Sequence, residues 1–127
     1  MIAHRGASGY AFENSPAAFR EAAERGVDGV ELDVHATADG GIVVHHDPEL
    51  TGGRPLDTLT LAEATAWLLP NGEPVPTLAA ALTLIGDRDV WIEVKSLPVT
   101  YDAALLSALD RGPFPARYAV HSFDHRV

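Results

Sequence analysis

The sequence predicts an α/β fold of the (β/α)-barrel type, and three observations support this prediction. Apolar runs with strand-like alternation recur along the 127 residues, with segments of helical periodicity between them. Strands that alternate with helices favour a parallel sheet. Polar residues gather toward the C-terminal ends of the expected strands, where α/β folds place their functional sites. These polar positions are His4, Glu31 with Asp33, His46 with Asp47, Glu93 with Lys95, and His121 with Ser122.

Five strands are expected, and two of them carry alternating charge. Apolar and acidic residues alternate in the second strand, so Glu31 and Asp33 share one face. Glu93 and Lys95 repeat the pattern in a later strand. The expected strands cover residues 1–3, 30–34, 42–47, 90–95 and 118–123.

Capping residues and glycines mark four helices between these strands. Ser15-Pro16 is typical of a helix start, and Thr60 with Glu63 fits a capping box. Residues 48–58 and 70–76 lack periodicity and are expected to be loops. The expected helices run from Pro16 to Gly26, from Leu61 to about Leu68, from Leu78 to Gly86 and from Asp102 to Gly112.

Composition limits the functions that this chain can have. Nine basic and eighteen acidic residues give a formal charge of −9, which argues against nucleic-acid binding. No run approaches the roughly 20 apolar residues of a membrane span, and the N-terminus does not resemble a signal peptide. We therefore expect a single domain over residues 1–127, without stable membrane insertion, in the cytoplasm. Cysteine is absent, so disulfides and thiolate metal sites are excluded.

The paired carboxylates indicate a metal site. Glu31 and Asp33 would lie about 7 Å apart on one strand, which suits a hard cation such as Mg²⁺ or Ca²⁺. The alternative is the solvated face of an edge strand, but the repeat at Glu93 and Lys95 argues against it. His46, at the end of the next expected strand, adds a group that titrates near neutral pH.

Several short motifs occur in a characteristic order and spacing, namely AHRG (residues 3–6), EN (13–14), ELDV (31–34), HD (46–47), VPTL (75–78), EVK (93–95) and SF (122–123). In these motifs the sequence resembles the glycerophosphodiester phosphodiesterase family. That resemblance implies a (β/α)₈ barrel that hydrolyses glycerophosphodiesters, which are small molecules, to sn-glycerol 3-phosphate and an alcohol.

The resemblance also assigns roles to individual residues. It implies that His4 and His46 are the acid–base pair and that Arg5 and Lys95 face the phosphate. It makes three carboxylates the ligands of Mg²⁺ or Ca²⁺, namely Glu31, Asp33 and Glu93. The two cations could also be ion-pair partners of these carboxylates. His45 should point away from His46 and be structural.

Two features depart from the family pattern. Residues 48–56 read PELTGGRPL instead of an Arg-Thr-rich segment, so the preferred alcohol stays open. A full barrel takes at least about 200 residues, so we expect only its N-terminal five strands or so, in a truncated chain or a homodimer.

The resemblance implies that residues 30–34 and 42–47 are parallel despite the turn-like Asp39-Gly40-Gly41. The alternative functions are a phospholipase D-like phospholyase acting on choline phospholipids and a non-catalytic barrel fragment.

Overall fold

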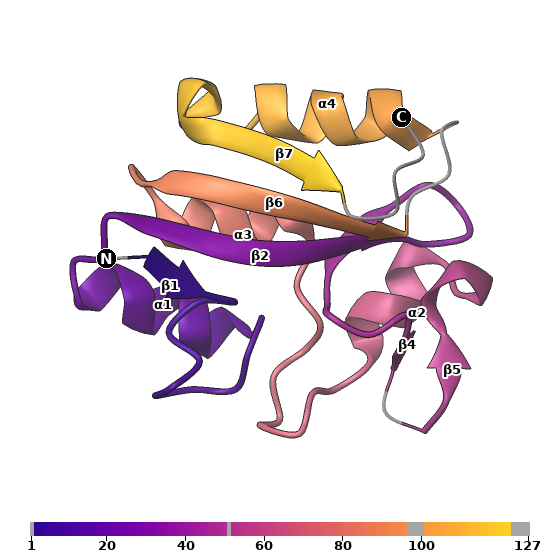
Figure 1. Cartoon of the computed structure of the whole chain (residues 1–127). Helices are drawn as coiled ribbons and strands as arrows, with labels where there is room; N and C mark the ends of the chain where they lie inside the picture. The colour runs from indigo at the N-terminus through magenta and orange to yellow at the C-terminus, as the bar shows by residue number, and fades with distance from the viewer. Residues whose placement is uncertain (1, 51, 97–100, 123–127) are drawn as a thin grey trace.

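Four parallel strands form the sheet that carries the polar positions. The computed structural model describes residues 2–50, 52–96 and 101–122. Within them the strand order is β1-β2-β6-β7, and every neighbouring pair along this order is parallel (Figure 1). The strands are β1 (Ile2–His4), β2 (Gly29–Ala36), β6 (Asp89–Ser96) and β7 (Tyr118–Ser122).

The expected parallel strand at residues 42–47 is wrong in both extent and direction. Strand β3 (Ile42–Val44) pairs antiparallel with the end of β2, in a register that places Val34 opposite Val44. The turn is held by Thr37, whose hydroxyl accepts from the Gly41 amide at 2.9 Å. The five-residue connection is too short for a parallel crossover, which takes a dozen or more residues. The sheet therefore has four barrel-type strands and one hairpin extension.

Three of the helices begin at the capping residues that the sequence indicated. Ser15 accepts from the Ala18 amide at 3.1 Å, and Thr77 accepts from the Ala80 amide at 3.1 Å. Thr60 and Glu63 form the expected capping box. The helices are α1 (Pro16–Glu24), α2 (Leu61–Ala66), α3 (Leu78–Ile85) and α4 (Asp102–Asp110).

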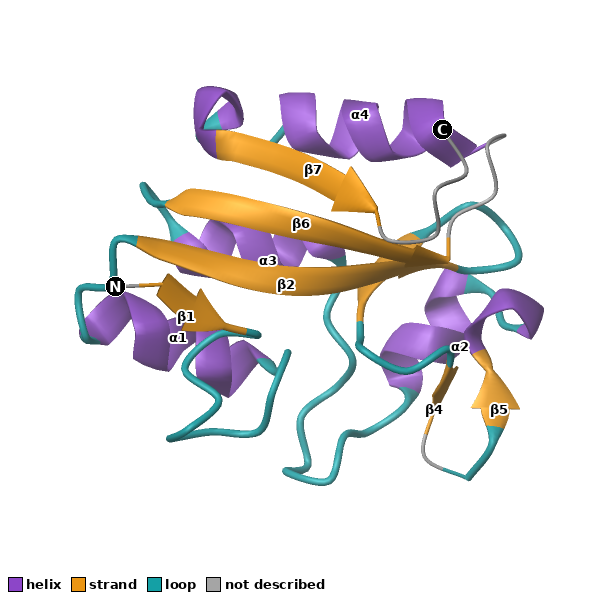
Figure 2. Cartoon of the chain, viewed as in Figure 1, coloured by secondary structure: helices purple, strands orange, loops and turns teal. Residues whose placement is uncertain are grey.

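The main core lies between one face of the sheet and helices α1, α3 and α4. Side chains that alternate along the two central strands, such as Leu32 and Ile92, are fully buried there. They pack with apolar residues of the helices, including Phe19 and Leu82. Figure 2 shows α3 behind the central strands and α4 beside β7. Because one face is used for packing, the alternate side chains lie on the opposite face of the sheet.

Residues 48–58, expected to be a loop, contain short secondary structure. They form β4 (Glu49–Leu50), β5 (Arg54–Pro55) and a 3₁₀ turn (Leu56–Thr58), and β4 pairs antiparallel with β5. Two-residue strands are too short to show periodicity, so alternation of residue types does not reveal them. These elements and α2 surround a second apolar cluster near the end of β2 (Figure 1). Its buried members are Val43, Leu50, Leu56, Leu59, Ala64, Leu69 and Val75.

The remaining elements agree with the expected pattern. A second 3₁₀ turn (Pro115–Arg117) leads into β7, and Phe123, the expected last residue of that strand, lies outside the described residues. Among the residues that the structure describes, no helix has the length and apolar character needed to cross a membrane.

Candidate metal-dependent active site

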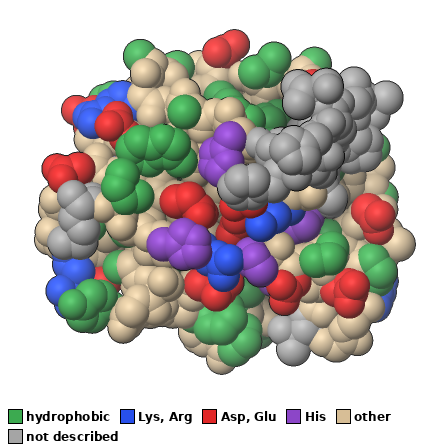
Figure 3. All heavy atoms as spheres, in the orientation of Figure 1, with side chains coloured by type: hydrophobic (Ala, Val, Ile, Leu, Met, Phe, Trp, Pro, Cys, Tyr) green, Lys and Arg blue, Asp and Glu red, His purple; other side chains and the backbone are tan. Residues whose placement is uncertain are grey.

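The register of the central strands brings the predicted polar residues onto one face. Asp33 of β2 lies opposite Glu93 of β6, and His4 of β1 lies opposite Glu31. Residues that pair across a sheet point to the same side, so all four belong to the face opposite the main core. Figure 3 shows acidic, basic and histidine side chains gathered at the centre of this face.

The three predicted metal ligands form one compact cluster. Glu31, Asp33 and Glu93 each offer an oxygen, and these oxygens lie within 4.8 Å of one another. Ligands at Ca²⁺ distances of about 2.3–2.6 Å lie up to about 5 Å apart, so the cluster fits one cation. Asp33 Oδ1 and Glu31 Oε1 are buried and have no hydrogen-bond partner. Buried oxygens of this kind are costly unless a cation or donor satisfies them. These residues therefore fit a hard divalent cation.

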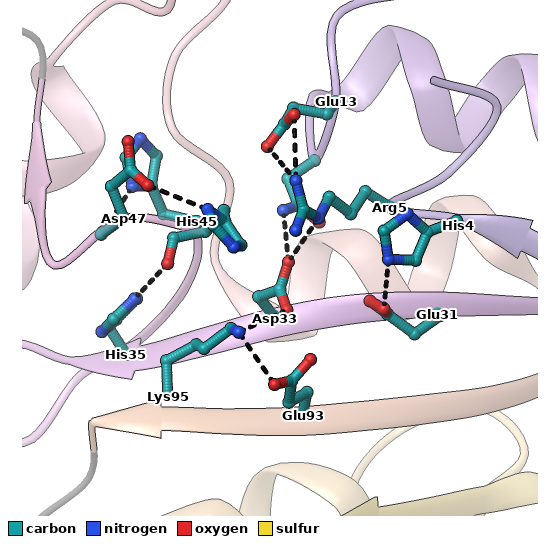
Figure 4. A network of polar contacts seen from close by, with 12 residues as sticks. His4, Arg5, Glu13, Glu31, Asp33, His35, His45, Asp47, Glu93 and Lys95 are labelled. Carbon is teal, nitrogen blue, oxygen red and sulfur yellow. Dashed lines mark hydrogen bonds and ion pairs between the residues drawn. The ribbon is translucent and has the colours of Figure 1, made fainter. Parts of the chain in front are cut away.

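Asp33 is held on its other oxygen by one hydrogen bond and one ion pair. Its side chain is fully buried, and Oδ2 accepts from Asn14 Nδ2 at 3.0 Å. The Nε atom of Arg5 lies 3.2 Å from the same oxygen. The guanidinium of Arg5 also donates to both carboxylate oxygens of Glu13, at 3.1 and 3.2 Å (Figure 4). Arg5 thus links two carboxylates, as the ion-pair alternative proposed.

Lys95, on β6, is also paired with the carboxylate cluster. Its Nζ atom lies 2.8 Å from Glu93 Oε1 and 4.0 Å from Asp33 Oδ1. Its side chain is 28 % exposed, so the ammonium can reach a ligand from its present position. Arg5 and Lys95 therefore approach the carboxylate cluster from opposite sides (Figure 4).

Burial makes the carboxylate cluster difficult to ionise without a cation. Burial, together with the negative charges of Asp33 and Glu93, raises the pKa of Glu31 to about 7. Burial likewise raises the pKa of Asp33. Burial would also raise the pKa of Glu93, but the hydrogen bond from Lys95 contributes to a net lowering. The pKa values of the three carboxylates are therefore pushed apart, as occurs at many functional sites.

The two predicted acid–base residues lie on different sides of the cluster. His4 Nε2 lies 3.0 Å from Glu31 Oε2, and its side chain is 63 % exposed. His46 Nδ1 lies 2.8 Å from Asp47 Oδ1. A carboxylate on one ring nitrogen fixes the orientation of an imidazole and leaves the other nitrogen available for proton transfer.

His45 and His46 were expected to point to opposite sides, but the structure places both beside one cavity. The His45 amide donates to the Asp33 carbonyl at 3.0 Å, so its backbone continues the β2–β3 ladder beside the cluster. Both histidines line the same cavity of about 580 Å³. The His46 carbonyl bonds to Nε2 of the buried His35, and burial lowers the pKa of His35. His35 therefore supports the segment that carries both histidines.

That cavity lies beside Arg5 and Asn14, which contact Asp33, and it reaches Leu50 of the second apolar cluster. Its walls include the Arg5 and Glu13 pair and residues of the β4–β5 hairpin. A cavity of this size is large enough for a small-molecule ligand. Its other lining residues are Phe12, Asn14, His45, His46, Asp47, Pro48, Glu49, Leu50, Gly53 and Pro70.

Comparison with known proteins identifies the family. The sequence profile of the glycerophosphoryl diester phosphodiesterase family matches residues 4–106. The chain belongs to this family. A glycerophosphodiester phosphodiesterase of Caldanaerobacter subterraneus is 39 % identical over 141 residues, which cover 98 % of this chain and 58 % of the relative. The resemblance inferred from the motifs is therefore confirmed.

Solved structures of phosphodiesterases share the fold. A glycerophosphodiester phosphodiesterase from Parabacteroides distasonis superposes with a TM-score of 0.85 at 30 % identity, covering 98 % of this chain and 56 % of the other. A phosphodiesterase from Oleispira antarctica, solved with its product sn-glycerol-3-phosphate, gives 0.88 at 29 % identity and covers 98 % and 57 %. The barrel-type fold is confirmed, and the chain spans somewhat more than half the length of these proteins.

Three residues near the site were missed or left undecided. Glu13 and Asn14 formed a family motif, but neither was assigned a role, and both contact site residues directly. His121 was noted as a polar position but given no role, and it lies opposite Glu93 in the β6–β7 register, on the same face of the sheet as the clustered carboxylates. Strand alternation could have placed His121 there, because it is out of phase with Tyr118 and Val120 of the same strand.

Proposed function

We propose that this site hydrolyses glycerophosphodiesters to sn-glycerol 3-phosphate and an alcohol, with a bound Mg²⁺ or Ca²⁺. The observation that carries the proposal is the carboxylate cluster with unpartnered oxygens, which contacts His4 and, through Arg5 and Asn14, adjoins a cavity lined by His46. Membership of the phosphodiesterase family supports the same reaction class. When bound, the cation would neutralise phosphate charge and acidify an attacking hydroxyl or water.

The histidines supply proton transfer in this proposal. One removes a proton from the attacking hydroxyl or water, and the other donates a proton to the leaving alcohol oxygen. We assign these roles to His4 and His46, whose carboxylate contacts at 3.0 and 2.8 Å orient the two rings. Attack by the neighbouring glycerol hydroxyl, through a cyclic phosphate that is then hydrolysed, is the favoured route.

Arg5 and Lys95 orient the phosphate. Each is already paired with a carboxylate, so their combined charge offsets the acidic cluster instead of creating a free basic patch. Each cation retains N–H groups that can donate to a phosphate oxygen while it keeps its carboxylate contact. This arrangement favours a small anionic diester over a long polyanion, in agreement with the net charge of −9.

The direct test is an activity assay on this chain across a metal panel. Glycerophosphocholine is the substrate, and sn-glycerol 3-phosphate is detected with its dehydrogenase. We expect turnover with Mg²⁺ or Ca²⁺ and none in excess chelator, because all proposed ligands are carboxylates. Glu93→Gln should lose activity, whereas the exposed Glu24→Gln should not. Full activity in chelator would disprove the metal assignment, and a cyclic phosphate as the final product would instead indicate a phospholyase.

The same assay distinguishes the two neighbouring histidines. His46→Ala should reduce turnover by about 10²-fold or more, the usual contribution of an acid–base group. His45→Ala is the matched control, because its ring lines the same cavity and contacts only the Asp47 carbonyl, at 2.8 Å. Normal turnover of His46→Ala with an inactive His45→Ala would transfer the role to His45.

Two copies of this chain could also associate through the sheet. We propose a homodimer as its partner state, because β1 and β7 are the outer strands of the parallel order. A second β7 or β1 could continue the hydrogen bonding of either strand.

A further inference from the structure

We propose that Asn14 is a positioning residue for the metal site, a role that rests on the function proposed above. Its side-chain amide fixes Asp33 so that only one carboxylate oxygen faces the cation. The residue was part of a sequence motif but has no role in the proton transfers or ion pairs already described. Asn14 is 2 % exposed, and its Nδ2 donates to Asp33 Oδ2 at 3.0 Å.

The two oxygens of Asp33 have different environments. Oδ2 lies 3.0 Å from Asn14 Nδ2 and 3.2 Å from Arg5 Nε. Oδ1 has no hydrogen-bond partner, and the nearest described cation is Lys95 Nζ at 4.0 Å. Asp33 supplies one oxygen to the cluster with Glu31 and Glu93. The hydrogen bond from Asn14 to Oδ2 restricts rotation of the Asp33 carboxylate, so Oδ1 keeps one direction.

The backbone around Asn14 shows why this residue type occupies the position. Asn14 and Arg5 both have φ near +55°, in the left-handed region that non-glycine residues rarely adopt. Asparagine tolerates this region better than most residues. The Asn14 amide donates to the Arg5 carbonyl at 2.8 Å, which joins the two left-handed segments. Ser15, the next residue, caps α1 and anchors Asn14 from the other side.

The two contacts of Asp33 Oδ2 are not equivalent. Arg5 forms an ion pair with Asp33, also donates to Glu13 and is proposed to bind a phosphate, so its guanidinium is shared among several anions. Asn14 is neutral and enclosed, and it retains its contact whether or not an anion is present. Residues that orient a metal ligand in this way typically change metal affinity by about 10–100-fold when they are removed.

The experiment compares metal binding by Asn14→Gly and the unaltered chain. Glycine adopts positive φ without strain, so this substitution removes the amide and leaves the turn intact. Isothermal titration with CaCl₂ and with MgCl₂ should show affinity weakened by about 10–100-fold. The metal-free melting temperature should fall modestly, because a buried carboxylate loses a donor, and the stabilisation produced by added Ca²⁺ should shrink. A merely structural asparagine would lower the metal-free melting temperature and leave the stabilisation by Ca²⁺ unchanged.

Asn71→Gly is the matched control. Asn71 also donates to a carboxylate, Glu73 at 3.0 Å, but it is exposed and lies outside the site. Its metal affinity should equal that of the unaltered chain. In Asp33→Asn, which loses the ligand charge, adding Asn14→Gly should cause no further loss, because the contact acts through Asp33.

Each result bears on the proposal. Unchanged metal affinity in Asn14→Gly, or additive losses with Asp33→Asn, would overturn the positioning role and leave the proposed function intact. Unfolding of Asn14→Gly would give the residue a structural role and overturn the proposal as well. If the unaltered chain binds neither metal, both the metal-dependent function and this inference fail.

Discussion

At the residue scale, the raised pKa of Glu31 can be tested directly. Its pKa is raised to about 7, with burial as the largest cause, whereas an unfolded chain has its ordinary value near 4.5. Between these values the folded metal-free protein binds more protons than the unfolded chain. Folding stability must therefore fall as pH rises through this range. A cation reverses the effect, because metal binding requires the deprotonated carboxylate.

We predict that the metal-free chain loses stability between pH 4.5 and 7.5 through Glu31. The loss is at most about 3.5 kcal/mol, from a conversion of about 1.4 kcal/mol per pKa unit. Denaturant unfolding in chelator should reveal it, and Glu31→Gln should flatten that part of the profile. Added Ca²⁺ should restore stability at pH 7.5 only in the unaltered chain. A profile that is identical in Glu31→Gln would contradict the raised pKa.

Strand periodicity predicted the strand-borne carboxylates of this site but assigned no role to Asn14. Period-two alternation assigns Glu31, Asp33 and Glu93 to one face because strand geometry leaves no other choice. Asn14 precedes a helix in a left-handed turn, and no periodicity relates that turn to the centre of the sheet. Its contact with Asp33 spans 19 positions and depends on tertiary packing.

At the element scale, the loop from β1 to α1 is fixed by a close approach to the helix. Gly6 has φ of +79°, and a Cβ there would lie 2.8 Å from Ala18 Cβ and 2.9 Å from the Ala18 backbone. Ala7, the next residue, donates its amide to the Ala18 carbonyl at 3.0 Å. This packing holds His4 and Arg5 at the edge of the carboxylate cluster.

Gly6→Ala should therefore destabilise the fold and displace the adjacent site residues. We expect a loss of about 2–4 kcal/mol, from an overpacked contact and an unfavourable φ. Chemical denaturation measures the loss, and Ca²⁺ titration should show weaker binding. Gly9→Ala is the control, since its Cβ would meet nothing within 4 Å. Equal stability of the two variants would show that the helix can yield at Ala18.

The hairpin at β3 shows where the expectation of parallel barrel strands was wrong. The local signal, a short connection with Asp39-Gly40-Gly41, indicated a hairpin correctly, but the expectation of barrel strands outweighed it. The hairpin extends β2 beyond the barrel-type sheet, with Ala36 paired to Ile42, and turns the chain into the second apolar cluster. A short connection is a geometric limit that a fold-level expectation cannot override.

At the scale of the whole molecule, β1 and β7 are the two outer strands of the parallel order. Within the described residues, β1 pairs only with β2, and β7 pairs only with β6. Exposed apolar side chains lie on both outer strands, with Ile2 51 % and Val120 43 % exposed. Closed barrels remove such edges, and open ones tend to pair with other chains. The same parallel direction at both edges permits two copies to join β7 of one to β1 of the other.

We therefore predict that a chain of these 127 residues self-associates. Light scattering over a concentration series should show mass rising toward a dimer. Val120→Lys should shift the chain toward monomer, because a charged side chain on an outer strand opposes edge pairing. Leu68→Lys is the control, since Leu68 is 59 % exposed but lies outside the sheet edge. A monomer at all concentrations with a cooperative melt would mean that the outer strands are stable without a partner.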